Sequence, residues 1–248
     1  IFLPQEYWSI DGLMKTALGV VIKSRLVLLD GKKLEKFSLP NGEAAQRARD
    51  LIISYQDYAI SSIKKKEAQR HPTAPFTTST LQQEASRKLG FSASRTMRVA
   101  QSLYEGINLG GETVGLITYM RTDSVTLSKS AVSSMRSYIE SHYGTPYVSP
   151  TERVYKTKAR NAQEAHEGIR PTLFDKAPGD IQRFLSSDEA KLYGLIWKRT
   201  LASQMASARY NQVAVDIMNG TETIGFRANG STLLFDGFLK VYEEGSDL

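Results

Sequence analysis

The chain is predicted to have an α+β multidomain fold, because strand-like patterns at both of its ends flank a helical middle. The two ends are rich in alternating and β-branched residues, whereas apolar residues in the middle recur at helical spacing. A proline-containing break, His71-Pro72-Thr73-Ala74-Pro75, separates the first pattern from the second. The simplest arrangement is an all-α domain, residues 76–207, inserted into a β-rich domain that residues 1–75 and 208–248 form together.

The first β-rich part contains two predicted strands and one predicted helix. Residues 19–29 are aliphatic and β-branched and are followed by Asp30-Gly31, which is a turn signal. Residues 43–53 have helical spacing after a break at Pro40-Asn41-Gly42. Residues 58–67 return to strand-like content, so we expect the sheet to resume there.

The helical middle opens with threonines and serines that can cap a helix. Ser79 with Gln82 fits a capping box, and Gly90 is expected just past the end of this first helix. A second helix is predicted from Ser92 to Glu105, with a stop at Gly106. Its buried stripe is predicted to consist of Met97, Ala100, Leu103 and Tyr104.

Two more helices and a β-rich tail complete the prediction. Ser128 is expected to cap a helix that ends near Tyr143-Gly144, and residues 188–207 are expected to form a long amphipathic helix. Asn-Gly pairs are strong hairpin signals in the tail. The predicted strands and turns are residues 211–218, Asn219-Gly220, residues 221–228, Asn229-Gly230 and residues 231–241.

Composition limits the classes of function. A net charge of +6 and a pI near 9.3 favour an anionic partner. The absence of cysteine excludes disulfides and cysteine-based zinc sites and fits a cytoplasmic protein. No apolar run of about 18 residues is present, so no membrane span is expected. The start has neither methionine nor a basic region, and is interpreted as lying inside a longer gene rather than as a signal peptide.

Two basic runs are candidates for contact with phosphates. Lys156, Lys158 and Arg160 alternate along the chain, so an extended backbone would set them in one row that could follow a nucleic-acid strand. Lys64-Lys65-Lys66 and Arg70 form the second run. This second run is equally consistent with an exposed sheet edge that is kept charged to prevent edge pairing.

The segment Gly115–Ser124 contains the strongest chemical signal. Tyr119 and Arg121 are two residues apart, and an extended chain would place both side chains on one face. A phenol beside a fixed cation suits attack on a phosphodiester, because the cation can stabilise charge on the phosphorus oxygens. The alternative is an ordinary strand with a buried tyrosine and a turn at Arg121–Ser124.

Three segments together resemble the motifs of type IA DNA topoisomerases. The first is Ala74–Ala85, the second is the Tyr119 segment, and the third is Gln163–Thr172. Met120 between the tyrosine and the arginine, and the run His166-Glu167-Gly168-Ile169-Arg170-Pro171-Thr172, are similar to the bacterial topoisomerase I branch of the family. Gly168 departs from the alanine that is common at its position.

The resemblance implies an enzyme that cuts and reseals one DNA strand without ATP and relaxes negative supercoils. Tyr119 would attack a single strand and become bonded to the 5′ phosphate, with Arg121 and His166 as further catalytic residues. The β-rich domain would be an arch, a distorted barrel or sandwich, and the helical domain would carry the tyrosine. The residues expected to contact DNA are Thr118, Gln82, Gln83, Lys156, Lys158, Arg160 and Arg170.

The resemblance also implies parts that this chain lacks. The family binds Mg²⁺ with an acidic cluster containing Asp-x-Asp in a separate N-terminal Toprim domain, and no Asp-x-Asp occurs here. The family also carries a DNA-binding motif, Ser-Ala-Gly-Arg-Val-Gln-Ser, before this region and cysteine-rich zinc modules at its C-terminus. This chain contains neither. We therefore expect that this chain binds no metal and does not relax DNA by itself. Its expected partners are the missing domains and single-stranded DNA, and no membrane is expected among them.

Two other classes of function stay open at this point. A non-catalytic module that binds single-stranded DNA would share the basic charge and would contain Tyr119 incidentally. A relaxase or a tyrosine recombinase would also use a tyrosine nucleophile. A relaxase is expected to have a His-x-His pair, which is absent, and a recombinase is expected to have its own arginine and histidine constellation around a C-terminal tyrosine.

Overall fold

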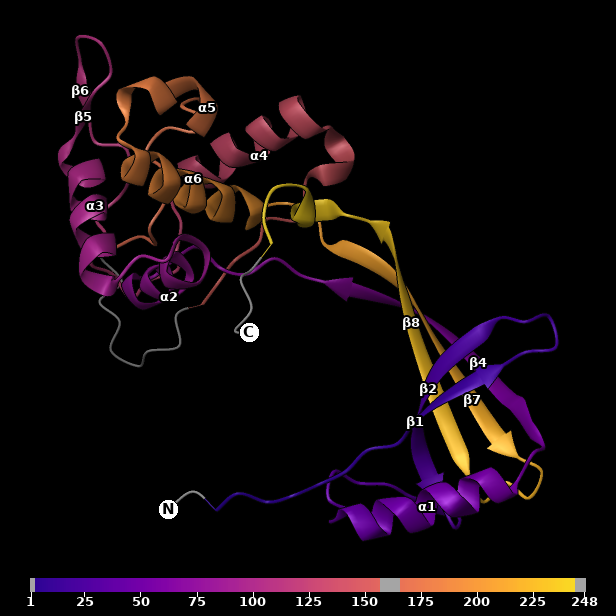
Figure 1. Cartoon of the computed structure of the whole chain (residues 1–248). Helices are drawn as coiled ribbons and strands as arrows, with labels where there is room; N and C mark the ends of the chain where they lie inside the picture. The colour runs from indigo at the N-terminus through magenta and orange to yellow at the C-terminus, as the bar shows by residue number, and fades with distance from the viewer. Residues whose placement is uncertain (1–2, 157–165, 244–248) are drawn as a thin grey trace. The chain divides into compact units, whose positions relative to one another are not determined.

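The computed structural model describes residues 3–156 and 166–243, and these fall into two compact units (Figure 1). Unit 1 comprises residues 3–68 and 210–234, and unit 2 comprises residues 69–156, 166–209 and 235–243. Unit 1 is mostly sheet and unit 2 is mostly helix. The predicted domain boundaries, residues 1–75 with 208–248 and residues 76–207, stay a prediction. No helix in the described residues is long and apolar enough to cross a bilayer.

Unit 1 is built on one open sheet whose strands differ in length. Its strands follow the order β1-β2-β8-β7-β4, and β3 pairs with β2. The pairs β1–β2 and β2–β8 are antiparallel, and β2–β8 shifts register between Leu26 and Leu28. The strands are β1 (Asp11–Lys15), β2 (Val21–Leu29), β3 (Lys32–Lys33), β4 (Tyr58–Arg70), β7 (Ala208–Asn219) and β8 (Gly225–Phe235).

The predicted distorted barrel or sandwich is wrong for the described residues, which form one open sheet in this unit. β1 and β4 lie at opposite edges and do not pair with each other, so the sheet stays open. The core of this unit is formed by Leu26, Ile217, Ile224 and Phe226. Helix α1 (Gly42–Ser54) packs Leu51 and Ile52 against that core, which means that a helix covers it where a sandwich would place a second sheet.

The two Asn-Gly pairs behave differently. At Asn219 the chain turns, because the Asn219 side chain accepts hydrogen bonds from the backbone N–H groups of Thr223 and Ile224, both at 2.9 Å. Asn229-Gly230 lies inside β8, so the predicted second hairpin is wrong. A two-residue hairpin turn of this kind needs positive φ at both positions, and neither residue has it.

The lysine run lies on edge strand β4, where Lys64, Lys65 and Lys66 are exposed. Lys64 approaches Asp216 at 4.0 Å. This position agrees with the interpretation that the run keeps a sheet edge charged.

Unit 2 is organised around helix α6, which contacts α2, α3 and α5 (Figure 1). α6 is the most buried helix of this unit, and its apolar residues from Leu192 to Ala202 form much of the core. The helices are α2 (Thr78–Leu89), α3 (Ala93–Glu105), α4 (Lys129–Tyr143), α5 (Pro178–Ile181) and α6 (Ser187–Ala202). The short elements are β5 (Ile107–Asn108), β6 (Thr113–Val114), η1 (Thr145–Tyr147), η2 (Gln182–Phe184) and η3 (Gly237–Lys240).

Local capping signals located α3 and α4 correctly. Ser92 and Ser128 are their N-caps, and Gly106 and Gly144 are their C-caps. Gly90 ends α2 in the left-handed conformation, as predicted, with φ of 66°.

Three details of the helix prediction are wrong. The capping box of α2 joins Thr77 and Thr80 rather than Ser79 and Gln82. Helix α6 ends at Ala202, because the backbone after it turns to pair with residues before Arg153; the N–H of Ala206, for example, donates to the Tyr147 carbonyl at 2.8 Å. Tyr104 is 40% exposed rather than part of the buried stripe of α3.

Candidate active site

The segment that carries Tyr119 is a bent loop, not the extended strand that was expected. Its backbone bends at Thr118, Met120 and Arg121, and its one bridge joins Ile117 to Pro171. Burial nevertheless alternates from Tyr119 onward: Tyr119 is 40% exposed, Met120 is 1% exposed, and Arg121 is exposed again. The loop therefore presents both the phenol and the guanidinium to solvent, and the alternative of a buried tyrosine does not hold.

The first motif fixes the loop just after Tyr119. The backbone N–H of Thr78, the first residue of α2, donates to the Thr122 carbonyl at 2.9 Å. The Thr78 hydroxyl donates to the Met120 carbonyl at 2.7 Å and accepts from the Thr122 N–H at 2.9 Å. Three hydrogen bonds thus attach the start of a helix to the residues that follow the tyrosine.

The third motif fixes the loop just before Tyr119. The N–H of Thr118 donates to the Arg170 carbonyl at 2.9 Å. The Thr118 hydroxyl donates to the Gly168 carbonyl at 2.8 Å and accepts from the Arg170 N–H at 3.0 Å. The first and third motifs also meet directly, because the N–H of Ile169 donates to the carbonyl of buried Phe76 at 2.8 Å.

Gly168 occupies a crowded place in this arrangement. A side-chain Cβ at this position would lie 3.3 Å from both Pro75 Cβ and the Ser124 carbonyl oxygen. All three motifs therefore pack together at Gly168, and they form a single cluster around Tyr119.

Two rings flank the Tyr119 ring. Tyr104, from the end of α3, approaches it edge-on with 5.4 Å between ring centroids. The His166 ring lies 5.9 Å away at a tilt of 59°. Among the described residues, none hydrogen-bonds to the Tyr119 hydroxyl, so this oxygen is open to a reacting group.

The two arginines of the cluster differ. Arg121 forms no ion pair with any described residue and is exposed. Arg170 is half-buried and donates from its Nε to Glu167 and from its Nη1 to the Pro171 carbonyl at 2.9 Å. Burial alone would raise the pKa of Glu167, but the hydrogen bonds that it accepts from Arg170 and Ser128 outweigh burial and lower the pKa. Arg121 is the cation that is available to a ligand, and Arg170 shapes the loop.

The other residues that were expected to contact DNA lie either on the surface or outside the described part of the chain. Gln82 is half-buried and Gln83 is exposed on α2, and Lys156 is exposed. Lys158 and Arg160 fall within residues 157–165, which lie outside the described residues. The proposed basic row therefore has one described member.

The described residues offer no metal site. No three of their histidine, aspartate and glutamate side chains gather as ligands would. The resemblance places the Mg²⁺ ligands in a separate domain, and no chemical step is assigned to a metal held by the described residues.

The sequence prediction missed two residues that build the cluster. Thr78 looked like one of several capping candidates, and Tyr104 looked like a core residue of α3. For Thr78, its place within the first motif was the signal that could have identified it. For Tyr104, the helical pattern predicted a side chain that faces the core. Its contact with Tyr119 follows only from the position of the loop.

Comparisons with known proteins cover nearly the whole chain. A family model described as DNA topoisomerase matches residues 1–247. DNA topoisomerase 1 of Rickettsia bellii is 47% identical over 246 residues, which cover 99% of this chain and 31% of that protein. DNA topoisomerase 1 of Xylella fastidiosa (strain Temecula1) is 49% identical over 249 residues, covering 99% and 30%.

A solved structure shares the fold. The structure of full-length topoisomerase I from Thermotoga maritima aligns with a TM-score of 0.75 and 32% identity, over 99% of this chain and 39% of that one. This chain spans about a third of the length of the curated relatives above.

Proposed function

We propose that this chain supplies the nucleophile of a bacterial topoisomerase I of type IA. The chain belongs to the DNA topoisomerase family, and its relatives are DNA topoisomerase 1 proteins of bacteria. In a longer polypeptide it would cut and reseal one DNA strand without ATP and so relax negative supercoils. The observation that carries this proposal is the exposed Tyr119, held by hydrogen bonds from two other motifs on either side of it.

The proposed reaction is a reversible transesterification. The Tyr119 oxygen forms a bond to a backbone phosphorus while the bond from that phosphorus to the DNA 3′ oxygen breaks. The phenol loses its proton and the leaving 3′ oxygen gains one, which leaves a 5′-phosphotyrosyl link. Attack by the freed 3′ hydroxyl reverses each change, so the energy of the original ester is retained and ATP is not needed.

Side chains of the cluster have distinct proposed roles. A tyrosine hydroxyl is protonated at neutral pH, so its attack requires the loss of that proton and stabilisation of the charge on the phosphate oxygens. Arg121, which is free of ion pairs with the described residues, is proposed to stabilise the phosphorus oxygens. His166, whose ring lies 5.9 Å from that of Tyr119, is proposed to contact the scissile phosphate.

The proposed DNA contacts remain Thr118, Gln82, Gln83, Lys156, Lys158, Arg160 and Arg170. Thr118 and Arg170 both hydrogen-bond to backbone carbonyls of the protein, so their effect on DNA is proposed to act mainly through the shape of the loop. The single-stranded segment at the cleavage site is the proposed ligand.

Further domains complete the proposed enzyme. We propose that the helical unit is an inserted domain within a β-rich arch, and that Mg²⁺ and its acidic ligands belong to a Toprim domain outside this chain. This chain alone is therefore proposed to be incompetent in relaxation. The proposed location is the cytoplasm, where chromosomal DNA of a bacterium lies.

The test uses the full-length protein, Mg²⁺ and a single-stranded oligonucleotide labelled at its 3′ end. Label should stay on the protein in a denaturing gel, should be lost in Tyr119→Phe, and should persist in Tyr104→Phe, which removes the neighbouring hydroxyl. An adduct in Tyr119→Phe would refute the proposal. Tight binding of the oligonucleotide without any adduct would favour the alternative, a non-catalytic module for single-stranded DNA.

A further inference from the structure

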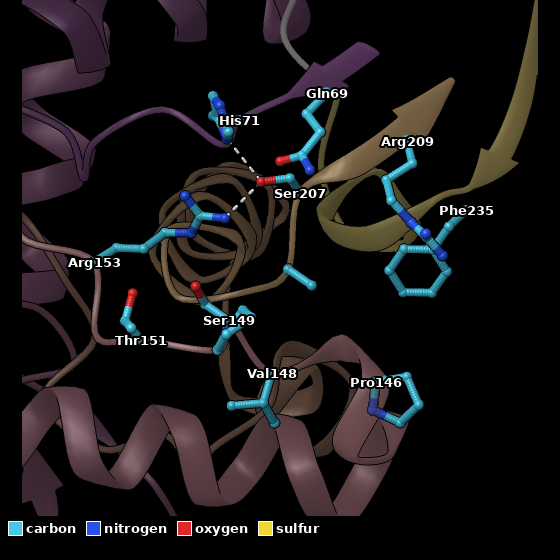
Figure 2. A pocket seen from close by; sticks show the side chains of 12 residues that line it. Gln69, His71, Pro146, Val148, Ser149, Thr151, Arg153, Ser207, Arg209 and Phe235 are labelled. Carbon is cyan, nitrogen blue, oxygen red and sulfur yellow. Dashed lines mark hydrogen bonds between the residues drawn. The ribbon is translucent and has the colours of Figure 1, made fainter. Parts of the chain in front are cut away.

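A cavity lies within unit 2 and shares no residue with the three-motif cluster. Its volume is about 420 Å³ (Figure 2). Pro146, Val148 and Phe235 give it apolar walls. His71, Arg153 and Arg209 contribute cationic or protonatable groups, and none of the described residues that line it is acidic. We call it the Ser207 cavity, because Ser207 lies between two of these groups.

Ser207 joins His71 and Arg153, as Figure 2 shows. The Ser207 Oγ lies 2.7 Å from His71 Nδ1 and accepts a hydrogen bond of 2.7 Å from Arg153 Nη2. The Arg153 Nε donates to the Met205 carbonyl at 3.0 Å. These bonds use two of the five N–H groups of the guanidinium and fix its direction.

The charge of Arg153 has no carboxylate partner among the described residues. The side chain is half-buried, and burial lowers the pKa of its guanidinium. A partly buried cation without a counter-ion is costly unless a ligand supplies the charge. An anion in the cavity would supply it.

Arg209 brings a second cation to the cavity. It is exposed, it forms no ion pair with any described residue, and its guanidinium carbon lies 5.7 Å from the centre of the Phe235 ring. Figure 2 places Arg209 beside Phe235, on the other side of the view from Arg153. Cationic groups thus face the cavity from more than one segment of the chain.

The size of the cavity distinguishes between anions. Sites of roughly 300–1,000 Å³ suit ligands larger than a bare phosphate. The apolar walls are suited to a sugar or a base next to the charged group, and guanidinium groups match phosphate oxygens in geometry. A phosphate that is part of a nucleotide chain fits this combination better than a free ion.

We propose that the Ser207 cavity binds a backbone phosphodiester of DNA, with Arg153 and Arg209 as its cationic contacts. That the ligand is DNA rests on the proposed function. The site is additional to the contacts proposed around Tyr119.

The test measures the binding of this chain to a fluorescent single-stranded oligonucleotide at a series of salt concentrations, in the Tyr119→Phe background so that no cleavage can contribute. Each lost phosphate contact should lower the slope of log affinity against log salt by about 0.7. We expect that reduction, and a loss of affinity of about fivefold at low salt, in Arg209→Gln and in Arg153→Gln. Arg209→Gln keeps the test valid if Arg153→Gln destabilises the fold, because Arg209 is exposed.

The matched control is Arg47→Gln, which removes an exposed arginine from α1. Losses equal to those of the cavity variants would show that net charge alone matters and would overturn the proposal. Unchanged binding in both cavity variants, or no binding by the parent chain, would overturn it too. Saturable binding of inorganic phosphate that depends on Arg209, without any effect on DNA binding, would identify a small-anion site and overturn the assignment to DNA.

Failure of this proposal is distinguishable from failure of the proposed function. The adduct assay with the full-length protein depends on Tyr119 chemistry, and the salt series does not. A normal adduct together with unaltered salt slopes would refute only the cavity assignment. Altered slopes with no adduct would refute only the catalytic role of Tyr119.

Discussion

The hydroxyl of Thr118 shows what one side chain beside a nucleophile contributes. It donates to the Gly168 carbonyl and accepts from the Arg170 N–H, which are backbone groups about 50 residues further along the chain. The residue next to Tyr119 is therefore fixed through the third motif. Local sequence could suggest a contact with DNA for Thr118, but it could not reveal a partner at that distance along the chain.

Glu167 makes the cluster sensitive to acid. Its folded-state pKa is lowered from 4.5, so its carboxylate stabilises the fold above about pH 4.5, and this stabilisation is lost as pH falls through the folded-state pKa. Glu167→Gln should lower the free energy of unfolding at pH 7, and the difference from the parent should shrink below about pH 4.5. Urea denaturation across pH measures this.

The control for Glu167 is Glu112→Gln, at an exposed glutamate in the turn between β5 and β6. Its stability profile should run parallel to that of the parent. A difference between Glu167→Gln and the parent that stayed constant down to the lowest pH would contradict the assigned role of the Glu167 carboxylate.

At the scale of elements, the first residues of α2 both cap the helix and hold the Tyr119 loop in place. The hydroxyl of Thr77 accepts from the Thr80 N–H, and the Thr80 hydroxyl accepts from the Thr77 N–H at 2.8 Å. Thr78, the next residue, carries the bonds to Met120 and Thr122. Loss of the cap would therefore loosen the loop as well as the helix.

Replacement of the cap has a defined expected cost. Thr77→Ala should lower the free energy of unfolding by about 1 kcal/mol, as for other N-cap threonines. Ser79→Ala, two residues away on the exposed side, should change it by less than about 0.5 kcal/mol. Chemical denaturation of both variants decides between the two capping boxes, and a larger cost for Ser79→Ala would contradict the structure.

The elements that sequence predicted well are those with local signals. Serine N-caps and glycine C-caps placed α3 and α4, because these signals act within one turn of the helix end. Asn229-Gly230 has the composition of a turn but lies within β8, where pairing with other strands keeps the chain extended. The end of α6 is likewise decided by backbone bonds to residues near Tyr147, about 60 positions earlier along the chain.

The roles of the candidate site residues stay a prediction, and the geometry around them differs from the expectation. Tyr119, Arg121 and His166 could be identified because their motifs resemble those of a family, and Tyr119 and His166 do lie together. The expected extended strand was wrong, since the bonds from Thr78 and to Gly168 bend the loop. Such bonds join segments that no periodic pattern relates to one another.

At the scale of the whole molecule, unit 2 needs both of its chain segments. Phe238 and Tyr242 are buried at 3% and 4% exposure, and the Tyr242 hydroxyl donates to Glu84 at 2.9 Å. Arg199 also donates to the Ala74 carbonyl at 2.7 Å. A helical domain limited to residues 76–207 would lose all of these contacts.

A deletion experiment tests this organisation. Residues 69–209, joined by a short linker to residues 235–243, should unfold cooperatively, whereas residues 76–207 should be less stable by on the order of 3 kcal/mol or more. Thermal denaturation of the two chains gives the comparison. Equal stability would show that the packing of Phe238 and Tyr242 contributes little.

The most direct test of the central claim, that Tyr119 is the nucleophile, is to map the DNA adduct of the full-length protein by mass spectrometry. Trypsin should release residues 99–121 as one peptide that contains both Tyr104 and Tyr119. Fragmentation of that peptide should place the nucleotide on Tyr119. A nucleotide on Tyr104, or on any other residue, would contradict the account.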